Sequence, residues 1–167
     1  MSSLRSQSVH VSRSEDRQRL LWAGGTVFDV VLGGGRTGGA VALLDQWAVR
    51  GDATPMHVHR TEAEIFYVLE GGITAWHDGA VHEVDAGGVV YLPAGQPHAL
   101  AIRTERARLI TVTAPGGFAD FVTEAGIPVE SDVPSAWEFD LDRIMQAAPA
   151  HQIDIVGPPP ALRSPMD

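Results

Sequence analysis

Short runs of apolar and β-branched residues, broken at regular intervals by glycine and proline, constrain this chain more than any other feature of its sequence. The pair Asp78-Gly79 separates two of these runs, and this dipeptide is typical of a tight hairpin turn. Short strands at this spacing predict an all-β barrel or sandwich. The expected strands cover residues 26–32, 40–49, 56–60, 64–70, 73–77, 81–84, 89–92, 98–103 and 107–113.

The segment after residue 114 has a different pattern. Phe118, Phe121 and Val122 share the spacing of one helix face, and Gly126 follows as a C-terminal cap. These positions predict a short helix. A second helix is expected over 139–148 and a last strand over 153–156.

The first residues of the chain are rich in serine and arginine. They are expected to form a weakly ordered arm or a strand exchanged with a neighbouring molecule. We therefore divide the 167 residues into three parts: an N-terminal arm (1–19), a barrel (20–114) and a C-terminal helical segment with a tail that packs on the barrel (115–167).

Composition excludes several classes of chemistry. The chain has no cysteine, which removes disulfides, thiolate nucleophiles and cysteine-bound metal sites. All of its basic residues are arginine, so it has no lysine for a Schiff base or a phosphate-binding loop. A net charge of −9 disfavours binding to nucleic acid or to an anionic membrane. Because no apolar run is long enough for a leader or a membrane span, we expect a cytoplasmic protein without nucleic-acid or membrane partners.

Histidines and one carboxylate carry the remaining chemistry. Alternate residues of a strand point to the same face, so His57 and His59 project together. Glu64 begins the next strand, and His98 begins a later strand after a proline- and glycine-containing turn. Three imidazoles and one carboxylate can converge on one metal ion. The spacing therefore predicts a metal site made by His57, His59, Glu64 and His98.

The same residues resemble the two signature motifs of the cupin superfamily. The first motif is glycine, five residues, His-x-His, three or four residues, glutamate, six residues and glycine. The second is glycine, five residues, Pro-x-Gly, two residues, histidine, three residues and asparagine. Only the final asparagine is missing, because Ile102 stands in its place; it is not a metal ligand in the family. The matching positions are Gly51, His57, His59, Glu64 and Gly71, then Gly87, Pro93, Gly95 and His98.

This resemblance implies a double-stranded β-helix, the jelly-roll barrel of cupins, with a short C-terminal helical appendage. It also implies one divalent transition metal, which could be Fe, Mn, Ni, Co, Cu or Zn, held inside the barrel near its mouth by the four predicted ligands. The run Pro-Gly-Gly-Phe-x-x-Phe at 115–121 and the later segment 151–158 are similar to those of monocupins grouped with quercetin 2,3-dioxygenase. In that group the helix lies over the barrel mouth. The predicted substrate pocket includes Phe118 and Phe121 of this helix and Phe66, which lies on the same side of its strand as Glu64. It also includes Trp47, because its strand immediately precedes the ligand strand.

Three functions fit these residues. The first is a quercetinase-like dioxygenase acting on an enolic or phenolic small molecule, with Glu64 as both metal ligand and catalytic base. The second is a non-oxidative metal enzyme, such as an isomerase, cyclase, decarboxylase or lyase. The third is a small-molecule-binding cupin without catalysis. Ile65, Tyr67 and Leu69 give one strand a second apolar face, so a homodimer is also expected.

Overall fold

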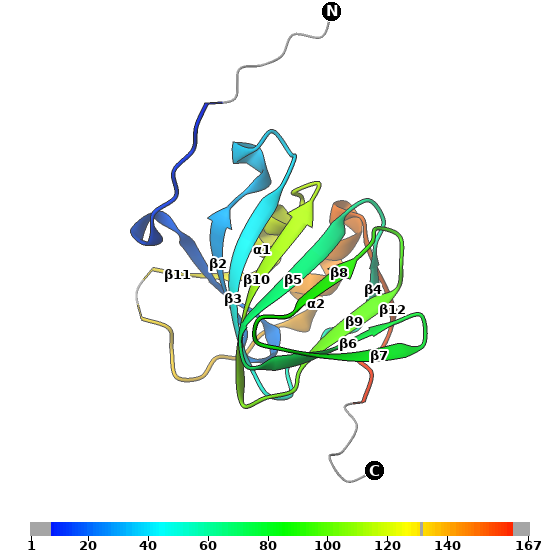
Figure 1. Cartoon of the computed structure of the whole chain (residues 1–167). Coiled ribbons are helices and arrows are strands. Elements are labelled where there is room, and N and C mark those ends of the chain that lie inside the picture. Colours follow the sequence, from blue (N-terminus) through cyan, green and yellow to red (C-terminus); the bar gives the residue numbers. More distant parts are fainter. Residues whose placement is uncertain (1–7, 131, 162–167) are drawn as a thin grey trace, which may run out of the picture.

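The computed structural model describes residues 8–130 and 132–161, and its strands form two antiparallel sheets (Figure 1). The seven-stranded sheet has the order β11 (Ile127–Val129), β1 (Gln18–Leu21), β2 (Val27–Leu32), β3 (Ala42–Val49), β10 (Arg106–Ala114), β5 (Ala63–Glu70) and β8 (Val89–Leu92). The five-stranded sheet has the order β12 (Ile153–Gly157), β4 (Met56–His59), β9 (His98–Ile102), β6 (Gly72–His77) and β7 (Ala80–Asp85). The all-β prediction is confirmed.

Two α-helices accompany the sheets, α1 (Phe118–Ala125) and α2 (Leu141–Ala147). They lie behind the strands of the seven-stranded sheet in Figure 1. Four short 3₁₀ turns complete the described elements: Ser14–Asp16, Ala23–Gly25, Gly34–Arg36 and Ala148–His151. Both predicted helices are therefore present, and α2 is shorter than the segment 139–148 expected to hold it.

The hairpin between β6 and β7 forms as the sequence predicts. Asp78 and Gly79 have φ angles of 50° and 73°, the left-handed conformation that a two-residue turn between twisted strands requires. The strands then pair from His77↔Ala80 to Gly72↔Asp85. The dipeptide therefore fixes the register of this edge of the five-stranded sheet.

The last two residues of the expected N-terminal arm (1–19) belong instead to the barrel, whereas residues 1–7 of that arm lie outside the described residues. Gln18 and Arg19 already belong to β1, which pairs with β2 and β11 of the same chain. Leu20 is fully buried, and the Arg19 side chain forms an ion pair with Asp29 at 2.7 Å. Burial of this strand and the ion pair on its outer side explain why it stays with its own barrel.

The C-terminal segment supplies strands as well as helices. Its β11 pairs with β1 and closes one edge of the seven-stranded sheet, although no strand was predicted there. Its β12 pairs with β4 and forms an edge of the five-stranded sheet. A short strand such as Ile127–Val129 leaves little periodic signal, because its partner and not its own sequence determines that it is extended.

The inner faces of the sheets hold two apolar clusters. One cluster, with Leu20, Phe28 and Leu44 among its members, packs the first strands against α1. The other cluster joins the two sheets through residues such as Val68 of the seven-stranded sheet and Ile73 of the five-stranded sheet. Apolar side chains from both sheets thus form the core, as expected of a jelly roll.

The outer face of β5 and β8 is also apolar. Ile65 lies opposite Tyr91, and Tyr67 lies opposite Val89. All four side chains are exposed in the single chain. The predicted homodimer would be consistent with this surface, and it stays a prediction.

Among the described residues, no helix is long and apolar enough to cross a membrane.

The replacement of the motif asparagine by Ile102 leads to a stability prediction. Ile102 is 1% exposed, pairs with Ile73 and belongs to the cluster that joins the two sheets. We expect Ile102→Asn to destabilise the protein by about 2–5 kcal/mol, because it removes apolar packing and buries an amide. Ile102→Val should cost only about 0.5–1.5 kcal/mol. Urea unfolding of both variants measures this, and an Ile102→Asn protein as stable as the native one would contradict it.

Candidate metal centre

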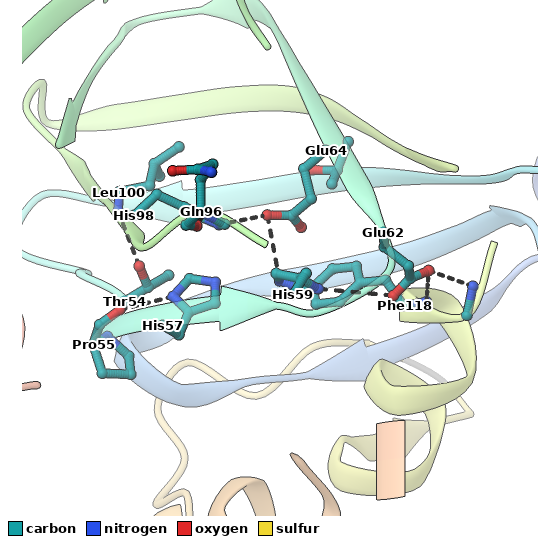
Figure 2. A network of polar contacts seen from close by, with 12 residues as sticks. Thr54, Pro55, His57, His59, Glu62, Glu64, Gln96, His98, Leu100 and Phe118 are labelled. Atoms are coloured by element: carbon teal, nitrogen blue, oxygen red, sulfur yellow. Dashed lines mark hydrogen bonds and ion pairs between the residues drawn. The ribbon is translucent and has the colours of Figure 1, made fainter. Parts of the chain in front are cut away.

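Strand pairing brings the four predicted ligands together. His57 and His59 lie on β4, and His98 is the first residue of β9, directly opposite His57. Glu64 comes from β5 of the facing sheet. Figure 2 shows Glu64 reaching toward the imidazoles of His59 and His98. The strands that carry the ligands therefore belong to both sheets, and the cluster lies between them.

The ligand atoms are close enough to share one ion. One nitrogen or oxygen from each of His57, His59, Glu64 and His98 lies within 4.8 Å of all the others. Oε2 of Glu64 is 3.0 Å from Nε2 of His98 and 3.4 Å from Nε2 of His59. Glu64, His59 and His98 are each only 2% exposed. The cluster is therefore a buried set of three nitrogen donors and one oxygen donor, which could bind a metal.

Hydrogen bonds to the backbone orient two of the imidazoles. Nδ1 of His57 lies 2.8 Å from the carbonyl oxygen of Pro55, and Nδ1 of His98 lies 2.9 Å from that of Gln96. Because a carbonyl can only accept, each Nδ1 carries a proton, which leaves Nε2 as the nitrogen that can bind a metal. Without a metal, Nε2 of His98 can donate a hydrogen bond to Glu64; with a metal, its lone pair would bind the ion, as is usual for metal-binding histidines.

The unpaired ring nitrogens of His59 indicate whether a metal ion would fit the cluster. Both of its ring nitrogens are buried and lack a hydrogen-bond partner among the described residues. Its Nε2 belongs to the cluster, and its Nδ1 lies 3.7 Å from Oε2 of Glu62. A buried ring nitrogen without a partner is unfavourable. A divalent cation bound at Nε2 would supply the missing interaction, so the donor set fits such an ion.

Burial and neighbouring charges shift the pKa values of the cluster residues in different directions. Burial and the neighbouring His98 lower the pKa of His57 to about 4. Burial alone would raise the pKa of Glu64, but the charges of the surrounding histidines and the hydrogen bond from His98 outweigh it and bring this pKa to about 2. Burial opposes the charged form of His59, but Glu64 and Glu62 raise its pKa overall. At neutral pH the cluster therefore holds an ionised carboxylate and a neutral His57.

Glu62 links the cluster to the helix that follows the barrel. It is 6% exposed, and its Oε1 accepts hydrogen bonds from the backbone N–H groups of Gly117 at 2.5 Å and Phe118 at 2.9 Å. Its other oxygen faces His59. One buried carboxylate thus caps the start of α1 and stands behind a candidate ligand. Sequence reasoning missed this residue, although it lies only two positions before Glu64.

The cluster forms part of the wall of a cavity of about 140 Å³. Three of the predicted pocket residues, Phe66, Phe118 and Phe121, line this cavity. Phe118 also contacts His59, with ring centroids 5.5 Å apart. The structure therefore brings these three aromatic side chains to the candidate site, and their role toward a substrate stays a prediction.

The structure does not bring Trp47 to this cavity, which corrects the predicted pocket. Trp47 is 37% exposed on the outer face of β3, and the guanidinium of Arg108 lies 4.6 Å from its ring centroid. Strand alternation explains the error, because the buried positions of β3 on either side of it are Gln46 and Ala48. Gln46 lines the cavity in its place.

Other lining residues come from segments that the sequence did not connect with the site. Trp22 lines the cavity and packs against Phe28 and Phe121, with ring centroids 5.6 Å and 5.5 Å apart. The C-terminal segment contributes apolar residues from α2 and β12: Leu141, Ile144, Ile153 and Ile155. This segment therefore walls the cavity.

Asp52 adds a second carboxyl group to the cavity wall. Its side chain accepts a hydrogen bond from the hydroxyl of Thr26. Burial raises its pKa to about 6, and the hydrogen bond from Thr26 opposes this shift only in part. Among the described residues, Asp52 is not part of the histidine cluster.

The position of Glu62 leads to a prediction about metal affinity. Glu62→Gln keeps an oxygen for the N–H groups of α1 but removes the negative charge behind His59. We expect about tenfold weaker metal binding, the lower end of the effect seen when a hydrogen-bonded neighbour of a metal ligand is replaced. Competition with a chelator measures this for Zn²⁺ or Ni²⁺.

A matched control is available on the second helix. Asp140 caps α2 by accepting a hydrogen bond from the backbone N–H of Asp142 at 2.9 Å. Asp140→Asn therefore replaces a capping carboxylate that does not belong to the cluster. It should leave metal affinity unchanged, and an equal loss in both variants would show that Glu62 acts only through helix stability.

The sequence of this chain is similar to a known protein family and to a known enzyme. Residues 47–113 match the family model described as the cupin domain. Over 153 residues, or 89% of this chain, the sequence is 29% identical to quercetin 2,3-dioxygenase from Bacillus subtilis (strain 168). The match spans 44% of that protein, so the chain covers less than half of the relative's length.

Solved structures share the fold at low sequence identity. KdgF from Halomonas sp. has a TM-score of 0.58 and 15% identity, over 65% of this chain and 94% of that protein. An RmlC-like cupin from Shewanella frigidimarina NCIMB 400 has a TM-score of 0.56 and 23% identity, over 65% and 93% of the two chains. At these identities the likeness shows the fold alone. Residues 47–113 are thus a cupin domain, and the chain as a whole resembles small cupins and the quercetin 2,3-dioxygenase of Bacillus subtilis.

Proposed function

We propose that this protein is a metal-dependent dioxygenase that acts on an enolic or phenolic small molecule. The observation that carries the proposal is the buried cluster of three imidazoles and one carboxylate in the wall of an apolar, partly aromatic cavity. Such a donor set suits divalent first-row transition metals and would leave about two of six positions open. The 29% identity to a quercetin dioxygenase over most of this chain supports oxidative chemistry.

The carboxylate of Glu64 is the candidate base. A divalent cation at this site would act as a Lewis acid and lower the pKa of a substrate hydroxyl bound beside it. With its own pKa at about 2, Glu64 is a weak base and is ionised throughout the neutral range. It can take up the proton only from a hydroxyl that has been made more acidic. Glu64 would thus hold the metal and also receive the substrate proton.

The aromatic wall would position the substrate and exclude water. Phe66 and Phe118 lie in the cavity wall with the cluster, and Phe118 contacts the ring of His59. Aromatic rings favour edge-to-face or offset stacking with a planar ligand. Exclusion of water strengthens the electrostatic interactions of the cluster with bound substrate. A flat, largely apolar molecule is therefore the expected substrate.

Metal content should depend on pH in a defined direction. Protons compete with the metal for the imidazole nitrogens, so metal affinity falls as pH falls. His59, whose pKa is raised, is protonated before His57, which resists protonation down to about pH 4. We expect close to one ion per chain at pH 8, partial loss near pH 6 and complete loss by about pH 4. Elemental analysis after dialysis at each pH measures this.

The ligand assignment is checked in the same assay. His98→Ala should lose most of the metal at pH 8, whereas His77→Ala should retain it, because Nδ1 of His77 contacts the carbonyl of Pro97 and His77 does not belong to the cluster. Stoichiometric metal retained by the native protein at pH 4 would contradict the assignment.

Oxygen consumption tests the proposed reaction. Metal-free protein is reconstituted separately with Fe²⁺, Mn²⁺, Ni²⁺, Co²⁺, Cu²⁺ and Zn²⁺ and supplied with a panel of enols and phenols. We expect at least one pair of metal and substrate to consume oxygen, with both labelled atoms of ¹⁸O₂ in the products. Glu64→Gln should abolish this uptake. Glu124→Gln, which alters an exposed carboxylate that contacts His151 at 2.8 Å, should not.

Two outcomes would overturn the proposal in distinct ways. Turnover of a substrate under strict anaerobiosis would replace it with a non-oxidative metal enzyme, such as an isomerase, cyclase or lyase. Tight retention of a ligand without turnover, with every metal tried, would replace it with a small-molecule-binding cupin.

A further inference from the structure

Gln46 is a buried polar residue of the cavity that the proposed chemistry at the metal does not use. It is 8% exposed on β3 and lines the same cavity as the cluster. The hydroxyl of Thr111 on neighbouring β10 donates a hydrogen bond to Oε1 of Gln46 at 3.2 Å. In the part of the chain that the structure describes, Nε2 of this amide has no acceptor. The cavity therefore contains an unpaired hydrogen-bond donor.

Two other polar side chains of the wall already take part in hydrogen bonds. Asp52 accepts from the Thr26 hydroxyl, and Oγ1 of Thr54 accepts from the backbone N–H of Leu100 at 2.9 Å. Nε2 of Gln46 is unpaired among the described residues, so it is free to donate to an oxygen of a ligand or of water in the cavity. Outside the cluster, Gln46 thus offers the wall a donor that could recognise an oxygen of the substrate.

Charge and polarity narrow the class of ligand. No arginine is among the described residues that line the cavity, and the chain has no lysine. A second anionic group, such as a carboxylate or phosphate, would therefore lack a cationic partner away from the metal. A sugar would bring more hydroxyl groups than this mainly apolar wall can pair. The wall favours a neutral, largely apolar molecule with few polar atoms.

Strand register separates Gln46 from the cluster. Gln46 pairs with Leu109 of β10, whereas Glu64 of β5 pairs with Thr113 of β10. Gln46 and Glu64 thus lie two strands apart on the inner face of the seven-stranded sheet. Their partners on β10 are four residues apart, which corresponds to two successive inward-facing rows. Rows on one face are separated by roughly 7 Å. An oxygen held by Gln46 is therefore not the oxygen at the metal but one on the far side of the same molecule.

The cavity has a volume of about 140 Å³, which limits how much of a ligand it can enclose. An engineered protein cavity of about 150 Å³ accommodates benzene. One ring with small substituents therefore fits, whereas a multi-ring molecule would have to extend out of the cavity.

We propose that Gln46 determines specificity by donating a hydrogen bond from Nε2 to a distal oxygen acceptor, such as a carbonyl, of a neutral single-ring phenol or enol whose hydroxyl lies at the metal cluster. This inference deepens the proposed function and rests on it for the metal-bound hydroxyl. It does not require that oxygen chemistry take place.

Two probes of the same size test the distal contact. Zn²⁺-loaded protein is titrated calorimetrically with 4-hydroxyacetophenone and with 4-ethylphenol, which lacks the distal carbonyl. The two phenols also differ in acidity, so the informative quantity is how the ratio of their dissociation constants changes between native protein and Gln46→Leu. We expect the preference for the ketone to fall about three- to tenfold in the variant, the size of one net hydrogen bond. Binding of 4-ethylphenol should change little.

Threonines on β10 provide matched variants. Thr111→Val removes the hydroxyl that orients Gln46 and should lower the ketone preference in part. Thr113→Val makes the same change two residues further along the same face, at a buried hydroxyl without a partner among the described residues, and should leave the preference unchanged. Gln46→Leu is nearly isosteric, and thermal unfolding confirms that each variant is folded.

The outcomes separate this inference from the proposed function. The inference is overturned if the ratio of the two dissociation constants is unchanged in Gln46→Leu, or if Thr113→Val changes it equally. Zinc-loaded protein that binds neither phenol also overturns it. A protein that shows the expected change in ratio but never consumes oxygen supports the role of Gln46 and overturns the dioxygenase. Failure to take up zinc overturns the metal cluster instead.

Discussion

An ionised carboxylate buried among three imidazoles is the interaction on which this site depends. Glu64 is 2% exposed, and an isolated charge at such a position would be strongly unfavourable. Its interactions with Nε2 of His59 and Nε2 of His98 offset that cost and keep its pKa at about 2. Without a cation, the positive charge must come from a proton on the histidines, which explains why the pKa of His59 is raised. A divalent metal would satisfy all four donors at once.

Local backbone and distant contacts orient the three imidazoles in different ways. His57 and His98 each direct Nδ1 at the carbonyl oxygen of the residue two positions earlier, Pro55 and Gln96. Both carbonyl groups lie just before the strand that carries the histidine, so each of these hydrogen bonds depends on local backbone geometry. His59 instead faces Glu62, whose carboxylate also caps α1. Only this ligand is therefore coupled directly to the helix that walls the cavity.

The sequence was informative where spacing alone determines geometry. Strand periodicity places His57 and His59 on one face, and the glycine- and proline-containing turns place Glu64 and His98 at strand starts, so the cluster could be predicted. Nearness along the chain to the ligand strand does not bring Trp47 to the cavity, because strand alternation on β3 turns Gln46 inward and Trp47 outward. Trp22 could not be placed, because its position depends on packing against rings from α1 and β2 and not on a local pattern.

The segment after the matched domain completes the site and is more than an appendage. The described register pairs β4 with β9 at only one position, His57↔His98. Along its other edge, β4 pairs with β12 through all of its residues, with Ile153 opposite His59 and Ile155 opposite His57. The ion pair between Arg60 and Asp154 fixes the end of the same strand pair. The strand that carries two of the four donors is therefore held mainly by residues 153–157, beyond the matched region 47–113. Because Ile153 and Ile155 also line the cavity, the segment that holds these donors in place also shapes the space beside them.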